Sequence, residues 1–354
     1  MNKKSLLYIG HSYHNKTKST AFLKELLEKN YHLTVFDFSP ETERYDKLLV
    51  FKDVCFDCLV LFQITPDLEK LKQYINTKKI VFFPMYDAVE HADFKFWYLY
   101  KEAKIINFSK TLHEKLLTFG LDTNYIQYFP KPIEKEPLLK GKVVYFWQRV
   151  SSIHFGLVEK LFSKIKVDKF LLHKALDPSQ QFVTPSKSIQ KHVEYSSWYA
   201  TKEEMFLALQ KANIYIAPRL TEGIGMSFLE AMAMGLCVVA NDKPTMNEYI
   251  KQGETGILYH QDNIEPLDDF DAVQIGKNAQ NYIKQGYEIW ENEKVNILKW
   301  MEEPVQINQL QMEKQICTIT YFLFSFLEIL KIRVLPHVVK IHLFRFIPLF
   351  YIKK

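Results

Sequence analysis

Short apolar runs that read as buried strands alternate with amphipathic runs that read as helices along most of this chain. A strand, a helix and a further strand are typical of a parallel βα unit, so the alternation predicts an α/β fold with parallel sheets. The predicted strands are 6–10, 32–38, 58–64, 80–85, 105–108, 143–147, 170–173, 214–217 and 237–240. The predicted helices are 20–28, 66–75, 110–119, 156–165, 202–211 and 226–234.

A proline-rich, charged segment from Phe129 to Gly141 interrupts this alternation and reads as a linker. The length of 354 residues suits about two domains. We therefore predict an N-terminal domain over 1–130, a linker over 131–142, a second α/β domain over 143–303 and a C-terminal extension over 304–354.

The segment from Ile214 to Tyr259 carries the strongest functional signal. A predicted strand ends at Ala217, a loop with two glycines follows, and a helix begins near Met226. A helix N-terminus at the carboxyl end of a parallel sheet favours an anion, because free amides and the helix dipole point toward it. A diphosphate is the anion that we expect there.

Two carboxylates flank this predicted anion site, Glu222 in the loop and Glu230 one turn into the helix. They would repel a phosphate, but they suit the hydroxyls of a sugar ring and a ribose as hydrogen-bond acceptors. The alternative is that Glu222 is a solvated loop residue and that Glu230 only complements the helix dipole.

This segment resembles the donor-binding signature of the retaining glycosyltransferases of family 4, or glycosyl transferases group 1, of the bacterial surface-polysaccharide type. The signature E-G-x-G…LEAMA-x-G is met by Glu222-Gly223-Ile224-Gly225, Leu229-Glu230-Ala231-Met232-Ala233 and Gly235. The likeness is close from Val143 to about Glu303, whereas the N-terminal half shares only the general βα plan.

The resemblance implies the GT-B architecture, in which two Rossmann-like domains face each other across a cleft. The C-terminal domain would hold a nucleotide sugar, the N-terminal domain an acceptor, and a helix within 270–300 would cross back to the first domain. Glu222 would lie against the donor sugar and Glu230 would bind the ribose. The loop residues Gly223 and Ile224 and the amides of Gly225, Met226 and Ser227 would border the donor.

The same resemblance assigns a phosphate-binding role to Arg149, which follows the first strand of the second domain. The family's usual lysine five residues later is replaced here by His154, which is either a weaker donor ligand or a polar residue at a helix start. We expect Arg149 and the helix amides to drive departure of the diphosphate, and front-face substitution to retain the anomeric configuration.

The N-terminal domain departs from the family pattern at the end of its strand 80–85. The family commonly has a histidine followed by an aspartate, and this chain has Tyr86 followed by Asp87, with His91 one turn later. Asp87 and His91 are catalytic candidates, although Asp87 also suits a helix N-cap. Tyr86 and His11, which follows the first strand, are candidates for the acceptor side.

No metal or other cofactor is expected, because no DxD sequence is placed as in metal-dependent transferases. The acidic run Asp268-Asp269-Phe270-Asp271 is instead predicted to cap a helix. The Cys55 and Cys58 pair could be redox-active or half of a zinc site, but it opens an apolar strand and is predicted to be buried and structural.

The net charge of +5 is concentrated in the last 51 residues, which hold seven bases and two acids among many aromatic side chains. This pattern predicts that 304–354 binds an anionic membrane surface, and it argues against a nucleic-acid partner. The alternative is that the extension docks on the catalytic domains or on a second copy. Four cysteines and no signal peptide predict a cytoplasmic protein, peripheral on the inner face of the cytoplasmic membrane.

The predicted function is transfer of a sugar from a nucleotide sugar to a glycan or lipid-linked acceptor in cell-surface polysaccharide synthesis. The alternatives are a nucleotide-sugar epimerase of the same fold and a non-catalytic glycan-binding or scaffold protein. A dinucleotide dehydrogenase is disfavoured because Ile9-Gly10-His11-Ser12 stands where G-x-G-x-x-G would follow the first strand.

Overall fold

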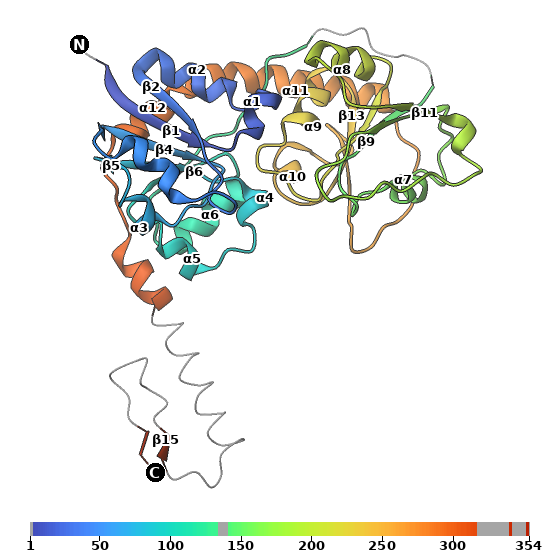
Figure 1. The fold of residues 1–354 in the computed structure, drawn as a ribbon. Helices are drawn as coiled ribbons and strands as arrows, with labels where there is room; N and C mark the ends of the chain where they lie inside the picture. Colours follow the sequence, from blue (N-terminus) through green and yellow to red (C-terminus); the bar gives the residue numbers. More distant parts are fainter. Residues whose placement is uncertain (1–2, 134–140, 317–339, 342–351, 354) are drawn as a thin grey trace.

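The computed structural model describes residues 3–133, 141–316, 340–341 and 352–353, and contains two parallel sheets (Figure 1). The first sheet has the order β2-β1-β4-β6-β7-β8, and all its neighbouring strands are parallel. Its strands are β1 Lys4–Gly10, β2 Tyr31–Asp37, β4 Cys58–Phe62, β6 Ile80–Phe83, β7 Lys104–Asn107 and β8 Thr123–Tyr125. A short parallel pair, β3 Cys55–Phe56 and β5 Asn76–Thr77, lies beside it.

The second sheet has the order β11-β10-β9-β12-β13-β14 and is also parallel throughout. Its strands are β9 Val143–Gln148, β10 Lys169–Lys174, β11 Val193–Ser196, β12 Ile214–Ile216, β13 Cys237–Asn241 and β14 Ile257–Tyr259. In both sheets the strand order reverses beside the first strand. Such a switch point opens a crevice at the carboxyl ends of the strands. The predicted α/β class with two parallel sheets is confirmed.

Helices cover both sheets, and the central strands are consequently buried on both faces. In β4 every residue is buried, as is every residue of β13. The helices of the first domain are α1 Tyr13–Thr17, α2 Ala21–Asn30, η1 Tyr45–Phe51, α3 Leu68–Leu71, α4 Tyr86–Val89, α5 Phe94–Tyr98 and α6 Lys110–Thr118. Those that follow are α7 Phe155–Leu161, η2 Gln190–His192, α8 Lys202–Leu209, α9 Met226–Ala233, α10 Met246–Tyr249, α11 Ala272–Glu293 and α12 Val295–Glu302.

The predicted helix 66–75 is wrong in its length. Asp67 caps α3 by accepting bonds from the amides of Glu69 and Lys70, but the helix ends at Leu71 and turns follow. The predicted helix cap at Asp271 is correct, because its side chain accepts bonds from the amides of Val273 and Gln274 at the start of α11.

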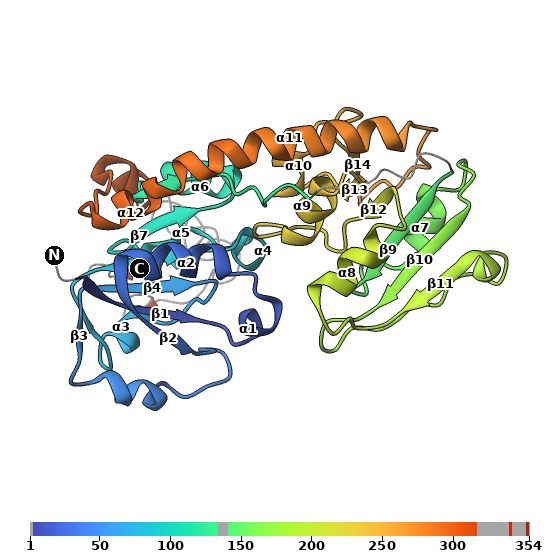
Figure 2. The same ribbon diagram turned by 90° about the horizontal axis from the view of Figure 1, so that it is seen from above.

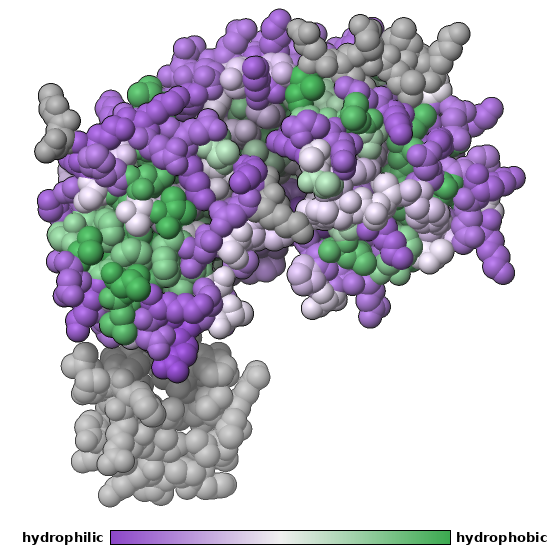
Figure 3. Space-filling view, turned by 45° about the horizontal axis from the view of Figure 1, so that its top comes forward, coloured by the Kyte–Doolittle hydropathy of each residue, from purple (hydrophilic) through white to green (hydrophobic). Residues whose placement is uncertain are grey.

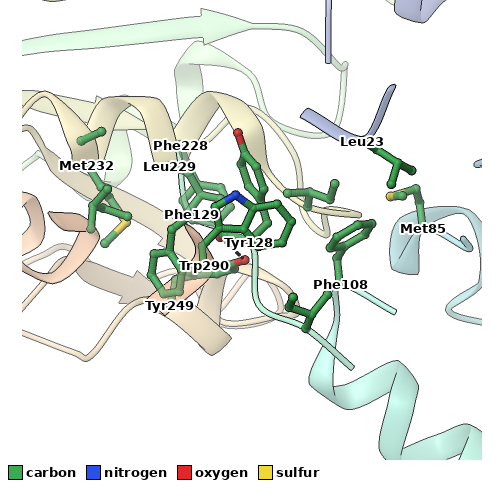
Figure 4. Packing of buried hydrophobic residues seen from close by; sticks show 14 of the residues in the cluster. Leu23, Met85, Phe108, Tyr128, Phe129, Phe228, Leu229, Met232, Tyr249 and Trp290 are labelled. Atoms are coloured by element: carbon green, nitrogen blue, oxygen red, sulfur yellow. Dashed lines mark hydrogen bonds between the residues drawn. The ribbon is translucent and has the colours of Figure 1, made fainter. Parts of the chain in front are cut away.

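The 22-residue helix α11 runs from the second domain back to the first, as the predicted crossing helix does (Figure 2). Near its end Trp290 packs edge-on against Tyr128 and Phe22 of the first domain, with ring centroids 5.1 and 5.7 Å apart. Figure 4 shows Tyr128, Phe129 and Trp290 gathered with Phe228 and Leu229 of α9 and Tyr249 of α10 in one cluster. Aromatic side chains of the two domains therefore pack against each other.

A carboxylate of the second domain also caps a helix of the first. Glu248, in α10, accepts hydrogen bonds from Ser109 Oγ at 2.8 Å and from the amides of Lys110 and Thr111 at 2.8 and 3.0 Å. These groups form the N-terminus of α6, where a negative charge is favoured. These three bonds tie the two domains together.

The described start of the predicted extension packs on the first domain. The Asn308 amide donates to the Gly120 carbonyl at 2.8 Å, and Met312 is buried in the core of that domain. For residues 304–316 the docking alternative is therefore correct. Most of the remaining extension lies outside the described residues. Among the helices that the structure describes, none is long and apolar enough to cross a membrane.

The prediction for the CxxC pair is half correct. Cys58 is buried in β4, but Cys55 is exposed in β3. The sequence pattern missed this because Cys55 lies on the short outer pair of strands rather than in the central sheet.

Candidate active site

The glycine loop ends at the N-terminus of α9, and its backbone requires glycine. Gly225 is the N-cap, with φ 82° and ψ 41° in the left-handed region, and a Cβ there would lie 1.9 Å from the Phe228 ring. The first amides of a helix have no partner within it and can bind an anion. Ser227, in this first turn, interacts with the Tyr215 hydroxyl. The loop is thus built to bring backbone close to a ligand.

Glu222 precedes this loop and is buried, with 8% of its surface exposed. Its Oε1 atom has no hydrogen-bond partner. Burial, followed by the nearby Asp87 carboxylate, raises the pKa of Glu222 to about 7, although Arg219 and Arg149 oppose this shift. The alternative of a solvated loop residue is therefore wrong, and near neutral pH the group can both donate and accept hydrogen bonds.

Four charged side chains of alternating sign lie next to Glu222. Arg149 Nε donates to Asp177 Oδ1 at 2.9 Å, and the other Asp177 oxygen accepts from Arg219 Nη2 at 2.6 Å. Arg219 Nη1 then reaches Asp87 Oδ2 of the first domain at 3.1 Å. We call these four residues the ionic chain. The formal charges of the ionic chain sum to zero, because both of its arginines are paired with its aspartates. Neither arginine is therefore paired with Glu222.

Arg149 lies at the end of β9, where the resemblance places a phosphate ligand. Its guanidinium packs over the Trp147 ring at 5.0 Å from the centroid. Burial would lower the pKa of Arg149, but Glu222, Asp177 and Tyr13 outweigh that effect and raise it. Nε is the atom that donates to Asp177, and the two terminal NH₂ groups have the geometry of a fork for a phosphate.

Glu230 is buried in α9 and forms an ion pair with Lys202 at the start of α8. Burial raises the pKa of Glu230, and Lys202 opposes the shift. The carboxylate therefore has a specific partner, so the alternative in which it merely complements the helix dipole is insufficient. A ribose hydroxyl at this position would share the carboxylate with Lys202.

The first domain brings Asp87 directly against the glycine loop. A Cβ on Gly223 would lie 2.7 Å from Met85 Cβ and 3.0 Å from Asp87 Oδ1. Asp87 stands in the first turn of α4 rather than at its N-cap, which is Met85. Its Oδ1 atom is buried without a partner, and burial raises the pKa of Asp87. Figure 3 shows the surface hollowed between the two domains.

Three predicted site residues, all histidines, bond to neighbours other than Glu222 and the ionic chain. His91 is 93% exposed and pairs with Glu90 at 3.1 Å. His11 is exposed, and its Nδ1 accepts a bond from the Tyr13 amide at 3.0 Å. His154 is the N-cap of α7, where its Nδ1 accepts from the Gly156 amide at 3.1 Å, as the capping alternative requires. Tyr86 is half-buried beside Asp87.

Sequence reasoning missed Asp177 and Arg219. Arg219 lies three residues before Glu222, just after β12, and Asp177 follows β10 in the same sheet. Carboxyl ends of parallel strands meet at one edge of a sheet. The signal in the sequence that points to them is that each is a polar residue following a predicted strand.

Comparison with known proteins agrees with this geometry. Residues 184–284 match the family model "Glycosyl transferases group 1". The chain is 33% identical over 104 residues to the phosphatidyl-myo-inositol mannosyltransferase of Mycolicibacterium smegmatis. That stretch covers 28% of this chain and 25% of the relative, so the chain matches about a quarter of the relative's length.

Solved structures match over a much larger part of the chain. Sucrose-phosphate synthase from Thermosynechococcus elongatus aligns with a TM-score of 0.62 at 13% identity, over 84% of this chain and 98% of that one. Anabaena HepE, solved in complex with UDP-glucose, aligns with a TM-score of 0.53 at 14% identity, over 84% and 100% of the two chains. The expected GT-B fold is confirmed, and the segment that matches the glycosyl transferases group 1 model, 184–284, contains Arg219, Glu222 and α9.

Proposed function

We propose that this protein is a glycosyltransferase that moves a sugar from a nucleotide-sugar donor to a glycan or lipid-linked acceptor in cell-surface polysaccharide synthesis. The observation that carries the proposal is the convergence of Arg149, Glu222 and the α9 N-terminus on the face that meets Asp87 of the first domain. The bound UDP-glucose of HepE and the mannosyl transfer named for the mycobacterial relative support this class of donor and reaction.

The reaction develops negative charge on the departing diphosphate and positive charge on the sugar ring. The terminal NH₂ groups of Arg149 and the first amides of α9 would donate to the diphosphate oxygens. A single preorganised donor of this kind is worth about 3–4 kcal/mol in the transition state. The buried oxygens of Glu222 and Asp87 that lack partners are acceptors for sugar hydroxyls. Glu230 would bind the ribose.

We propose that the transfer retains the anomeric configuration through front-face substitution. In that reaction the bond from the anomeric carbon to the diphosphate oxygen breaks. The acceptor oxygen bonds to the same carbon on the same face, and its proton passes to the departing phosphate oxygen. No enzyme nucleophile is then required, and Glu222 orients the sugar. Product analysis by NMR tests this, since a product of inverted configuration would contradict it.

No metal ion is required in this proposal, because arginine and helix amides supply the positive charge. Activity after treatment with EDTA should equal the untreated activity. A loss that added Mg²⁺ or Mn²⁺ restores would show that the diphosphate needs a metal.

We also propose that the extension 304–354 holds the enzyme on an anionic membrane surface, at the inner face of the cytoplasmic membrane. The basic sequence of the extension supports this. Where its described part packs on α6, the exposed side chains include Leu117, Leu310 and Ile316. Sedimentation with phosphatidylglycerol vesicles but not with phosphatidylcholine vesicles is the expected result, and replacement of Lys331, Arg333, Lys340 and Arg345 by glutamine should abolish it.

The direct test is a thermal-shift panel of nucleoside diphosphates and nucleotide sugars, followed by turnover of the best ligand. A ligand that binds only the folded state raises its stability. Release of nucleoside diphosphate with sugar transfer supports the proposal. Isotope exchange at a sugar carbon without transfer would indicate an epimerase. Glycan binding with no turnover of any nucleotide sugar would indicate a non-catalytic protein.

A further inference from the structure

The ionic chain crosses from one domain to the other through a single side chain. Arg219 places one terminal nitrogen on Asp87 of the first domain and the other on Asp177 of the second. Arg219 and Asp177 expose 29% and 19% of their side chains, and Arg219 Nε is buried without a partner. Such a bridge needs the planar fork of a guanidinium, because an ammonium group is a point charge without that fixed geometry.

The far end of the chain is the arginine that the proposed function assigns to the diphosphate. Asp177 holds Arg149 by Nε, so it fixes the plane of the guanidinium and the direction in which the two NH₂ groups point. Asp177 is in turn held by Arg219 at 2.6 Å. The Arg149 fork is therefore connected, through Asp177 and Arg219, to the bond that Arg219 forms with Asp87 of the first domain.

We propose that Arg219 is a positioning residue that links the meeting of the two domains to the orientation of Arg149. Resting on the proposed function, this inference adds that Arg149 is fully directed at the donor diphosphate only when Asp87, carried by the acceptor-side domain, engages Arg219. Arg219 itself need not touch the donor. The link sets how productively a bound donor reacts rather than how tightly it binds.

The test uses the full chain with Arg219→Gln, Arg219→Lys, Asp177→Asn and the double variant Arg219→Gln/Asp177→Asn. The matched control is Arg44→Gln, since Arg44 forms an exposed ion pair with Asp46 at 2.9 Å far from the ionic chain in the sequence. Release of nucleoside diphosphate is measured with whichever of UDP-glucose, UDP-galactose and GDP-mannose the wild type turns over.

Arg219→Gln should lower kcat about 100-fold, the loss typical of a slightly misplaced catalytic group, with a much smaller change in the donor KM. Arg219→Lys should recover part of the loss. Because both residues act through one link, the double variant should be no slower than the slower single variant. Wild-type kcat in Arg219→Gln, or losses that multiply in the double variant, would overturn the inference.

A second measurement separates this inference from the proposed function. The Arg149 Nε–H signal in a ¹⁵N NMR spectrum, assigned by its absence in Arg149→Lys, should be protected from exchange in the wild type and lose that protection in Arg219→Gln. Retained protection would overturn the link whether or not the protein is active. If the wild type turns over no nucleotide sugar while the signal behaves as expected, the proposed function fails and the link stands.

Discussion

Replacing Glu222 by glutamine tests the electrostatics of the candidate site at a carboxyl that has no arginine of its own. The folded protein holds the pKa of this group at about 7, against 4.5 as its ordinary value. The unfolded chain therefore loses this proton more readily, and ionisation favours unfolding as the pH rises through this window. The cost is absent below about pH 4.5 and fully present above about pH 7.

The magnitude follows from the size of the shift. One pKa unit corresponds to about 1.4 kcal/mol, so the buried carboxylate costs about 3 kcal/mol of unfolding free energy at pH 8 and less than about 1 kcal/mol at pH 5. Glutamine has nearly the same shape and carries no charge. Glu222→Gln should therefore stabilise the protein by about 2–3 kcal/mol more at pH 8 than at pH 5.

Urea unfolding followed by circular dichroism at the two pH values measures this difference. Glu288→Gln is the control, because Glu288 is exposed on α11, and its effect should be small and the same at both pH values. If Glu222→Gln changed stability equally at pH 5 and pH 8, Glu222 would not be a buried carboxyl within this set of charges.

Three further substitutions test the loop, the domain contact and the extension. An alanine in the left-handed conformation costs about 1–2 kcal/mol. Gly225→Ala should destabilise the protein by more than this in thermal unfolding, because its Cβ would lie 1.9 Å from the Phe228 ring. Gly253→Ala, at φ 73° with open space around the position, should show only the conformational cost. Glu248→Ala should cost about 1–2 kcal/mol in urea unfolding by uncapping α6, and an unchanged midpoint would contradict the interdomain cap. Met312→Ala should cost about 2–5 kcal/mol and Leu310→Ala, which is 63% exposed, less than about 0.5 kcal/mol; equal effects would mean that the start of the extension is not part of the first domain.

The sequence was sufficient to predict the parts of the fold that depend on local pattern. Runs such as Cys58–Phe62 are apolar throughout because both faces of a central parallel strand are buried, and a single sequence shows this directly. The length of α3 was not predictable in the same way. The apolar residues of 66–75 suit a helix, yet turns follow Leu71 and place Ile75 in the core of the first domain.

Some residues of the candidate site could likewise be predicted from local sequence patterns, and others could not. Glu222, Gly225 and Arg149 stand in patterns that the sequence alone reveals. In the structure Glu222 and Arg149 lie close enough for each charge to shift the pKa of the other. Asp177 and Arg219 act through contacts between segments that are 42 residues apart, and Arg219 meets Asp87 across 132 residues. Pairings between distant loops depend on how the two sheets face each other, which no local pattern encodes.

The two histidines of the first domain differ from Asp87 in their surroundings. His91 and His11 were candidates because they follow strands of the first domain, but their side chains are exposed and bonded to close neighbours in the sequence. A polar residue after a strand points to a site only when the following turn directs it into the cleft, as α4 does for Asp87.

The most direct test of the central claim compares release of nucleoside diphosphate from nucleotide sugars by the wild type, Arg149→Ala and the control Arg44→Ala. The wild type and the control should release nucleoside diphosphate from at least one nucleotide sugar. Arg149→Ala should remain folded and be slower by about 10²–10³-fold. An Arg149→Ala variant that works at the wild-type rate, or a wild type that neither binds nor cleaves any nucleotide sugar, would contradict it.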